Sequence, residues 1–200
     1  MIEFTPPIRR ATPGDAPALT QLIDFASLGF APCLWSKIAG PGGDPWAVGR
    51  ERVLREVGGF SYRNAVILER EGRVAAGLIG YPLADSPEPI PDNMPPMVVP
   101  LQELVNLAPG TWYVNILAAY PDQRGQGLGT ALLAVADKIA AETGGAGQSK
   151  RGLSLIVSDT NTGARRLYER TGYAEVARRR KVKEDWQNAG KDWVLLVKNA

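Results

Sequence analysis

The 200-residue sequence contains no histidine and only one cysteine, Cys33. Without histidine the chain cannot form a Ser-His-Asp triad, a Cys-His pair or a histidine-ligated zinc site. Proton transfer must therefore use carboxylates, tyrosine, lysine, cysteine or water, and we expect no metal. A single cysteine also excludes an internal disulfide. We interpret Cys33 as a small buried residue rather than as a nucleophile.

Long apolar runs and a strong net charge are also absent. No apolar run approaches the roughly 18 residues of a membrane span, so we expect no membrane partner. Residues 1–6 lack the basic and apolar regions of a signal peptide, which favours a cytoplasmic protein. The net charge of +2 does not indicate a nucleic-acid partner. The length and the 44% hydrophobic content suit one domain with a substantial core.

The most informative stretch is residues 112–142. Residues 112–119 are rich in aromatic, aliphatic and β-branched side chains, which predicts a mostly buried strand. A Pro-Asp pair ends this strand, and glycines follow at alternate positions: Gly125, Gly127 and Gly129. Apolar residues then recur on one face of a predicted helix: Leu128, Ala131, Leu132, Val135, Ala136 and Ile139. The glycines therefore lie at a helix N-terminus.

A glycine-rich helix N-terminus is suited to bind phosphate. Its first N–H groups have no partner inside the helix, the dipole adds roughly half a positive charge, and glycines let an anion approach closely. We therefore predict a phosphate or pyrophosphate site. The P-loop is excluded because Gly129 is followed by Thr130 rather than lysine, and the dinucleotide fingerprint because it needs glycine at position 130. The alternative is a tight connection with no ligand.

A second motif occupies residues 153–173. Residues 153–158 read as a short strand, Asn161 suits a helix N-cap, and Gly172 suits the C′ position of the same helix. Seven positions separate Asn161 from Tyr168, about two helical turns, so both can lie on one face. A phenol titrates near pH ~10, so Tyr168 could act as an acid at neutral pH. The alternative is a tyrosine of the core.

Together, the two motifs resemble those of the GNAT N-acetyltransferase superfamily. Arg124-x-x-Gly127-x-Gly129 is similar to the family's R/Q-x-x-G-x-G/A loop, which holds the pyrophosphate of acetyl-coenzyme A. Residues 161–173 are similar to its N-x-x-A-x-x-L-Y-x-x-x-G-F/Y segment. The resemblance covers most of the chain and is strongest over residues 111–176. It implies a single α/β (α+β) domain over residues 1–200, with a mixed central sheet of about six to seven strands flanked by helices.

The resemblance also implies a reaction and a set of site residues. The reaction is direct attack of a primary amine, on a small molecule or peptide, on acetyl-CoA. Tyr168 is implied as the catalytic acid that protonates the leaving thiolate. The residues implied to bind acetyl-CoA are Leu117, Ala118, Ala119, Arg124, Gly125, Gln126, Gly127, Leu128, Gly129, Thr130, Asn161 and Tyr168.

One departure from the family concerns the general base. Many members carry a glutamate on the strand before the glycine loop, whereas residues 111–119 contain no carboxylate and offer Asn115 and Tyr113 instead. The base is therefore unassigned, and either a water chain to a distant carboxylate or a neutral acceptor would replace it. A non-catalytic acyl-CoA-binding module and a transferase of a longer acyl group remain alternatives.

The remaining segments complete the expected order. Expected strands are residues 8–11, 65–69, 74–81, 173–178 and 192–198, and expected helices are residues 16–30, 34–39 and 46–56. We expect the aromatic residues of the helical region to belong to the core rather than to an acceptor pocket: Phe30, Trp35 and Trp46.

Two segments have open roles. Residues 82–110 are an insertion with eight prolines, too long for an ordinary strand connection, in which residues 97–107 could form one or two helical turns. The insertion is either a lid or wall over the acceptor site, a contact in a homodimer, or a surface excursion. The basic residues 178–183 are interpreted as a solvated hairpin, with contact to the 3′-phosphate of coenzyme A as the alternative.

Overall fold

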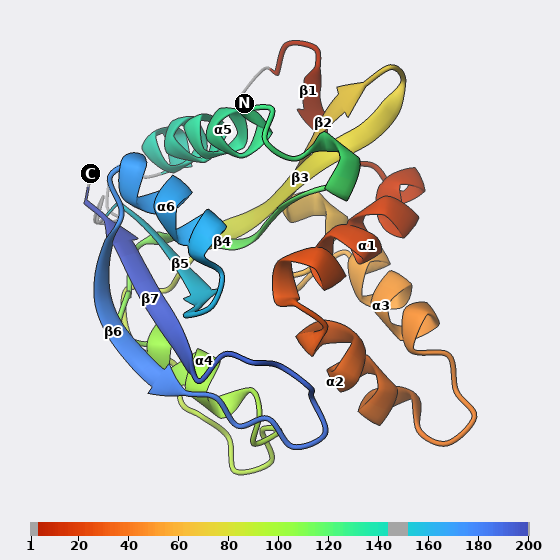
Figure 1. Cartoon of the computed structure of the whole chain (residues 1–200), viewed down its shortest axis with the longest axis vertical. Coiled ribbons are helices and arrows are strands. Elements are labelled where there is room, and N and C mark those ends of the chain that lie inside the picture. Colours follow the sequence, from red (N-terminus) through yellow and green to blue (C-terminus); the bar gives the residue numbers. More distant parts are fainter. Residues whose placement is uncertain (1–3, 144–151, 200) are drawn as a thin grey trace. The chain divides into compact units, whose positions relative to one another are not determined.

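The structure is a computed structural model that describes residues 4–143 and 152–199 (Figure 1). Its described strands are β1 (Ile8–Arg10), β2 (Ala65–Arg70), β3 (Arg73–Pro82), β4 (Trp112–Ala119), β5 (Leu153–Ser158), β6 (Ala174–Arg180) and β7 (Asp192–Lys198). Its described helices are α1 (Ala16–Ser27), α2 (Phe30–Ala39), α3 (Pro45–Leu54), α4 (Val99–Val105), α5 (Leu128–Thr143) and α6 (Thr162–Arg170).

The strands form one mixed sheet. Its order is β1-β2-β3-β4-β5-β7-β6. β4 and β5 are parallel, whereas the pairs β1–β2, β2–β3, β5–β7 and β6–β7 are antiparallel. This seven-stranded sheet and the six described helices confirm the predicted fold class. No single described helix is long and apolar enough to cross a membrane, and α1 with its preceding turn reaches that length only together with α2, across a bend of 118°.

The chain divides into two compact units. The first unit comprises Met1–Gly80 and Asn115–Leu132, and the second comprises Tyr81–Val114 and Leu133–Ala200. β4 and α5 contribute residues to both units. The first unit therefore contains the predicted glycine loop, and the second contains the predicted α6 motif.

The core of the first unit joins its three N-terminal helices to strands β2 and β3. Leu19 and Leu22 of α1 are fully buried, as are Val53 of α3 and Ile67 of β2. The hairpin between β2 and β3 turns at Glu71 and Gly72, which have φ of 50° and 70°. This turn lies where the sequence predicted it.

The predicted helix over residues 16–30 is wrong at its end. α1 stops at Ser27 because Leu28 and Gly29 adopt left-handed φ of 54° and 82°, and a new helix begins at Phe30. Apolar residues continue through the break because α2 also buries one face, so the periodicity hides it. Phe30 and Trp35 are buried as predicted, with 8% and 3% exposed.

Trp46 departs from the core prediction. It lies at the start of α3 with 37% of its surface exposed, and its ring contacts Trp35 edge to face at 5.9 Å. Asp44 caps α3 by accepting a hydrogen bond from Trp46 N at 2.9 Å. The cap thus places Trp46 in the first turn of α3, where its side chain is partly exposed.

In the second unit, the proline-rich insertion is anchored at both ends. Leu83 N donates to Thr111 O at 2.9 Å, and Gly110 N donates to Ala84 O at 2.8 Å. The helical turns predicted within the insertion are present as α4, and Met97 beside them is fully buried. The part of the insertion that contains Met97 and α4 is therefore packed into its unit, whereas most of residues 84–96 are exposed.

The basic run at residues 178–183 is not a solvated hairpin throughout. β6 extends to Arg180, so Arg178–Arg180 pair with β7 as strand residues. Lys181, which directly follows the strand, is buried with 6% of its surface exposed. The solvated-hairpin prediction is therefore wrong for Lys181.

Candidate coenzyme and acyl-transfer site

The glycine loop lies between β4 and α5 in the first unit. Gly125 and Gly127 have φ of 75° and 79°, a region that favours glycine, and nothing lies within 4 Å of a Cβ built at either position. Residues 124–127 are exposed. Ala131 N donates to Gly127 O at 3.1 Å, so the amides of residues 128–130 precede the helical ladder. The loop thus combines an open surface with helix-terminal N–H groups, as an anion site requires.

Two side chains of the glycine loop, Arg124 and Gln126, contact other residues of the first unit. Arg124 Nε donates to Ala119 O at 3.3 Å, and its guanidinium lies 5.8 Å from the ring centre of Phe25. Gln126 Nε2 donates to Asp122 O at 3.3 Å, and its Oε1 accepts from Arg70. These contacts hold the loop from its sides and leave the glycine backbone as the surface for an anion.

The end of β4 is tied to α1. Tyr120, the residue after the strand, donates its hydroxyl proton to Gln21 Oε1 at 2.8 Å and packs edge to face on Phe25 at 5.6 Å. Its backbone N–H donates to Ala75 O on β3 at 3.0 Å. The residues predicted to pair with the pantetheine arm, 117–119, are half-buried directly before this anchor.

The α6 motif has the predicted caps. Asn161 Oδ1 accepts a hydrogen bond from Ala164 N at 3.2 Å, which confirms the N-cap. Gly172 has φ of 93° in the C′ position after Thr171. Since the cap uses the oxygen of Asn161, its Nδ2 group is the part that could donate to a ligand.

Tyr168 lies in a cluster of tyrosines in the second unit. It is 7% exposed, and its ring contacts that of Tyr173 at 5.9 Å. Burial raises the pKa of Tyr168 to about 12, because the phenolate would lose its hydration. Tyr168 therefore stays protonated at neutral pH. This burial is compatible with both interpretations of Tyr168, the acid and the core residue.

The predicted site residues thus fall into two local groups. Residues 117–130 belong to the first unit, and Asn161 and Tyr168 belong to the second. The first group has an open glycine turn, and the second has the predicted N-cap and C′ glycine of α6.

No base is provided by the strand before the loop. Asn115 Nδ2 donates to Gly59 O at 3.4 Å, and Tyr113 is buried, with its pKa raised by that burial. In the first unit, burial also raises the pKa of Asp24 on α1, a half-buried carboxylate.

Across residues 4–143 and 152–199, no group of three or more potential metal-ligating side chains occurs.

Comparison with known proteins gives one family. The sequence model described as the acetyltransferase (GNAT) family matches residues 41–173, whereas no curated protein matches the chain. Among solved structures, an acetyltransferase is 21% identical, with 96% of this chain and 98% of that chain covered and a TM-score of 0.60. An N-acetyltransferase from Staphylococcus aureus Mu50 is 15% identical, with 95% and 98% covered and a TM-score of 0.59.

A third similar structure is ribosomal-protein-alanine N-acetyltransferase from Brucella melitensis. It is 21% identical, with 96% of this chain and 99% of that chain covered and a TM-score of 0.55. At 15–21% sequence identity these structures support the fold alone, and the assignment to a family rests on the match to the family's sequence model. That match covers more than half of the chain and includes both the glycine loop and the α6 motif. The chain therefore belongs to the GNAT acetyltransferase family.

Proposed function

We propose that the protein transfers an acetyl group from acetyl-CoA to a primary amine on a small molecule or a peptide. Family membership implies an acyltransferase. Acetyl-CoA is proposed as the donor because of the exposed turn at the N-terminus of α5. In this turn Gly125 and Gly127 have positive φ, and no atom lies within 4 Å of a Cβ built at either position. A diphosphate such as that of coenzyme A fits the charge and the close backbone approach of this turn.

The first unit would bind the coenzyme through its backbone. Amides of residues 124–130 would hold the pyrophosphate, and residues 117–119 would pair with the pantetheine amides. A backbone N–H at the end of β4 would polarise the thioester carbonyl as negative charge develops on its oxygen. These roles require little of the side chains, consistent with the contacts that hold Arg124 and Gln126 against their own unit.

The proposed reaction needs no covalent enzyme intermediate. The amine nitrogen attacks the carbonyl carbon, the C–S bond breaks, and the sulfur leaves as a thiolate. Tyr168 then gives its proton to the sulfur and regains one from solvent, while the new amide nitrogen loses a proton to water. With no carboxylate on β4, the acceptor would react as the neutral amine or pass its proton through water to a distant carboxylate.

A screen for thiol release from acetyl-CoA tests this function. The panel would contain simple primary amines, peptides with a free N-terminus and aminoglycosides. Peptides belong in the panel because a protein substrate is named for the similar enzyme from Brucella melitensis. Release with one acceptor class, with the acetylated amine seen by mass spectrometry, is the expected result.

Two further results, one from a binding titration and one from a repeat of the screen with longer acyl-CoA donors, would contradict the proposal. Acetyl-CoA binding without thiol release for any acceptor would favour a non-catalytic acyl-CoA-binding module. Faster turnover with longer acyl-CoA donors would favour a different acyltransferase.

A further inference from the structure

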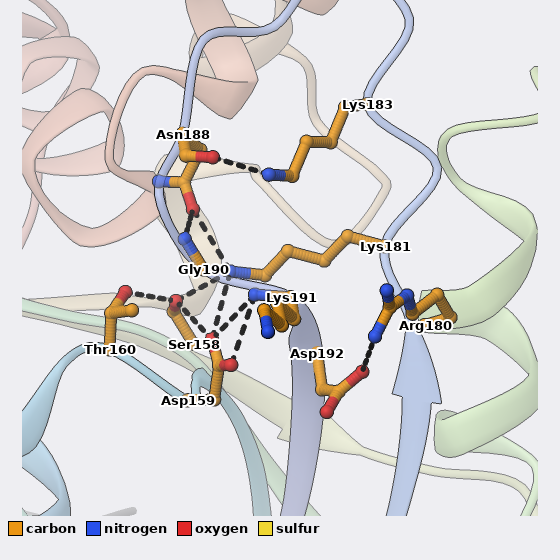
Figure 2. A network of polar contacts seen from close by, with 10 residues as sticks. All are labelled: Ser158, Asp159, Thr160, Arg180, Lys181, Lys183, Asn188, Gly190, Lys191 and Asp192. Carbon is orange, nitrogen blue, oxygen red and sulfur yellow. Dashed lines mark hydrogen bonds and ion pairs between the residues drawn. The ribbon is translucent and has the colours of Figure 1, made fainter.

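Lys181 is buried at the beginning of the connection between β6 and β7. Its side chain has 0% of its surface exposed. Burying an ammonium group is costly unless it is paired and hydrogen-bonded. In Figure 2 the side chain reaches from the end of β6 to the turn that follows β5. A lysine in such a position must be held by several partners.

Oxygen atoms from two segments surround the ammonium group. Lys181 Nζ donates to Ser158 Oγ at 2.5 Å and to Asn188 Oδ1 at 3.1 Å, and it lies 3.6 Å from Asp159 Oδ1 (Figure 2). Two of the three N–H donors of the ammonium group are thus used in hydrogen bonds, and the Asp159 carboxylate pairs with its charge. The group therefore connects segments rather than offering a site for a ligand.

Two indole rings lie over the same ammonium group. The Nζ atom is 4.6 Å from the ring centre of Trp193 and 5.3 Å from that of Trp186. The two rings are stacked at 5.5 Å with an interplanar angle of 11°. Cation–π attraction to these rings offsets part of the lost hydration.

The backbone fixes both ends of the connection 181–191. Lys181 N donates to Lys191 O at 2.9 Å, and Lys191 N donates to the carboxylate of Asp159 at 3.0 Å. Asn188 Oδ1 also accepts from Gly190 N at 2.8 Å. The connection is thus bonded to the turn after β5 at several points, with Lys181 at the centre.

Gly190 provides the space that this arrangement needs. A Cβ built at position 190 would lie 2.2 Å from Lys181 Nζ and 2.5 Å from Asp159 Oδ1. Gly190 is not among the glycines with positive φ, so the requirement comes from space and not from the backbone conformation. Any side chain here would displace the ammonium group.

The turn that Lys181 holds leads directly into α6. Asn161 N donates to Ser158 O at 3.0 Å, and Ser158 Oγ lies 2.9 Å from Thr160 Oγ1. Asn161 then caps α6 through Ala164 N. A short chain of bonds therefore runs from Lys181 through Ser158 to the start of the helix that carries Tyr168.

We propose that Lys181 is a positioning residue, whose buried ammonium group fixes the Ser158–Thr160 turn and so sets Asn161 and α6 for coenzyme binding and proton donation. This inference rests on the proposed acetyl-CoA-dependent function. Lys181 acts through the turn and touches neither donor nor acceptor in this role. Its contacts also explain why Gly190 and Trp186 occur in this connection and why Trp193 occurs at the start of β7.

The test compares Lys181→Met with Lys191→Met. Lys191 is exposed in the same connection, and its bonds to the network come from its backbone. Acetyl-CoA affinity is measured by calorimetry at a temperature where both variants are fully folded. Lys181→Met should weaken binding by about tenfold, because the turn would then have to be ordered on binding, at a cost of about the size of one immobilised side chain. Lys191→Met should match the wild type.

Hydrogen exchange gives a second measurement that needs no ligand. The amides of Asn161 and Ala164 should exchange faster in Lys181→Met and at the wild-type rate in Lys191→Met. If Lys181→Met does not fold, Gly190→Ala displaces the ammonium group more mildly, with Gly14→Ala as its control, because a Cβ at Gly14 meets its nearest atom at an ordinary 3.6 Å.

The inference would be overturned if folded Lys181→Met bound acetyl-CoA with wild-type affinity, exchanged its amides at the wild-type rate and showed only a lower melting temperature. That result would leave the proposed function standing. A wild-type chain that does not bind acetyl-CoA would overturn the proposed function and the coenzyme role of Lys181 together. In that case the exchange rates would still show whether Lys181 holds the turn.

Discussion

At the scale of single residues, Tyr168 and Tyr173 form a natural comparison. Both are buried, their rings contact each other, and burial raises the pKa of both hydroxyl groups. The hydroxyl of Tyr173 has no hydrogen-bond partner among the described residues. These two neighbouring buried phenols therefore allow the catalytic role proposed for Tyr168 to be tested against a matched tyrosine.

Tyr168→Phe should therefore lower kcat while leaving acetyl-CoA affinity nearly unchanged. Loss of a general acid costs roughly 10²-fold or more in rate. Steady-state kinetics with the acceptor found by the screen, together with calorimetry, would measure both quantities. Tyr173→Phe is the matched control and should keep the wild-type kcat. Equal kcat values for all three proteins would return Tyr168 to the role of a core tyrosine.

The pH dependence of kcat/KM should follow the acceptor amine. Tyr168, with a pKa of about 12, stays protonated at lower pH, so its deprotonation should cause no loss of rate below about pH 11. With no carboxylate on β4, the rate should rise with pH until the amine itself is neutral, near pH ~8 for an α-amine or ~10 for a lysine amine. A decline with a midpoint near pH 8 or 9 would contradict the assignment of Tyr168.

At the scale of elements, the sequence was most informative where the pattern is local. β4 and β5 begin and end at the predicted residues, because each is a short run of apolar side chains between clear breaks. The caps of α6 were also predictable, since Asn161 and Gly172 act on their own helix. These are the elements that carry the candidate site.

Features that depend on distant residues were not predictable. The break at Leu28 and Gly29 separates two helices that both bury apolar faces, so the pattern continues through it. Burial of Lys181 depends on Ser158 and on Trp193, which the fold brings together from other strands. The available signal was the pair of tryptophans close after the basic run, which a solvated hairpin would not need.

Gly49 tests the packing of α3 in the first unit. A Cβ at this position would lie 2.7 Å from Trp35 Cζ3 and 2.8 Å from Thr20 Cγ2, so the helices approach each other at the glycine. Gly49→Ala should destabilise the protein by about 1–2 kcal/mol, since overpacking outweighs the helix propensity gained. Urea unfolding would measure this against Gly14→Ala, which should change stability little. A stabilised Gly49→Ala would mean that α3 is not closely packed there.

At the scale of the whole molecule, ion pairs in both units make stability depend on acid pH. Hydrogen bonds from Arg9 lower the pKa of Asp15, and hydrogen bonds from Arg178 lower that of Glu175. Carboxylates with lowered pKa stabilise the folded state above their unfolded pKa, near pH ~4, and this contribution is lost as pH falls through the folded pKa. The free energy of unfolding should therefore fall below about pH 4.

Asp15→Asn should make this acid dependence shallower, because the buried carboxylate no longer takes up a proton on unfolding. Asp92→Asn, at an exposed position, is the control. Denaturant unfolding between about pH 2 and 7 would measure both slopes. Identical slopes for the wild type and Asp15→Asn would show that the Arg9 contact does not contribute in solution.

The most direct test of the central claim is calorimetric titration with acetyl-CoA, with free CoA alongside. Gly127→Glu would place a charged side chain in the proposed phosphate site. Gly42→Glu is its control, since Gly42 has φ of 76° against 79° for Gly127 and both positions are open. We predict binding of about micromolar affinity for the wild type and Gly42→Glu, and its loss in Gly127→Glu. No binding by the wild type, or equal affinity in all three proteins, would contradict the coenzyme site.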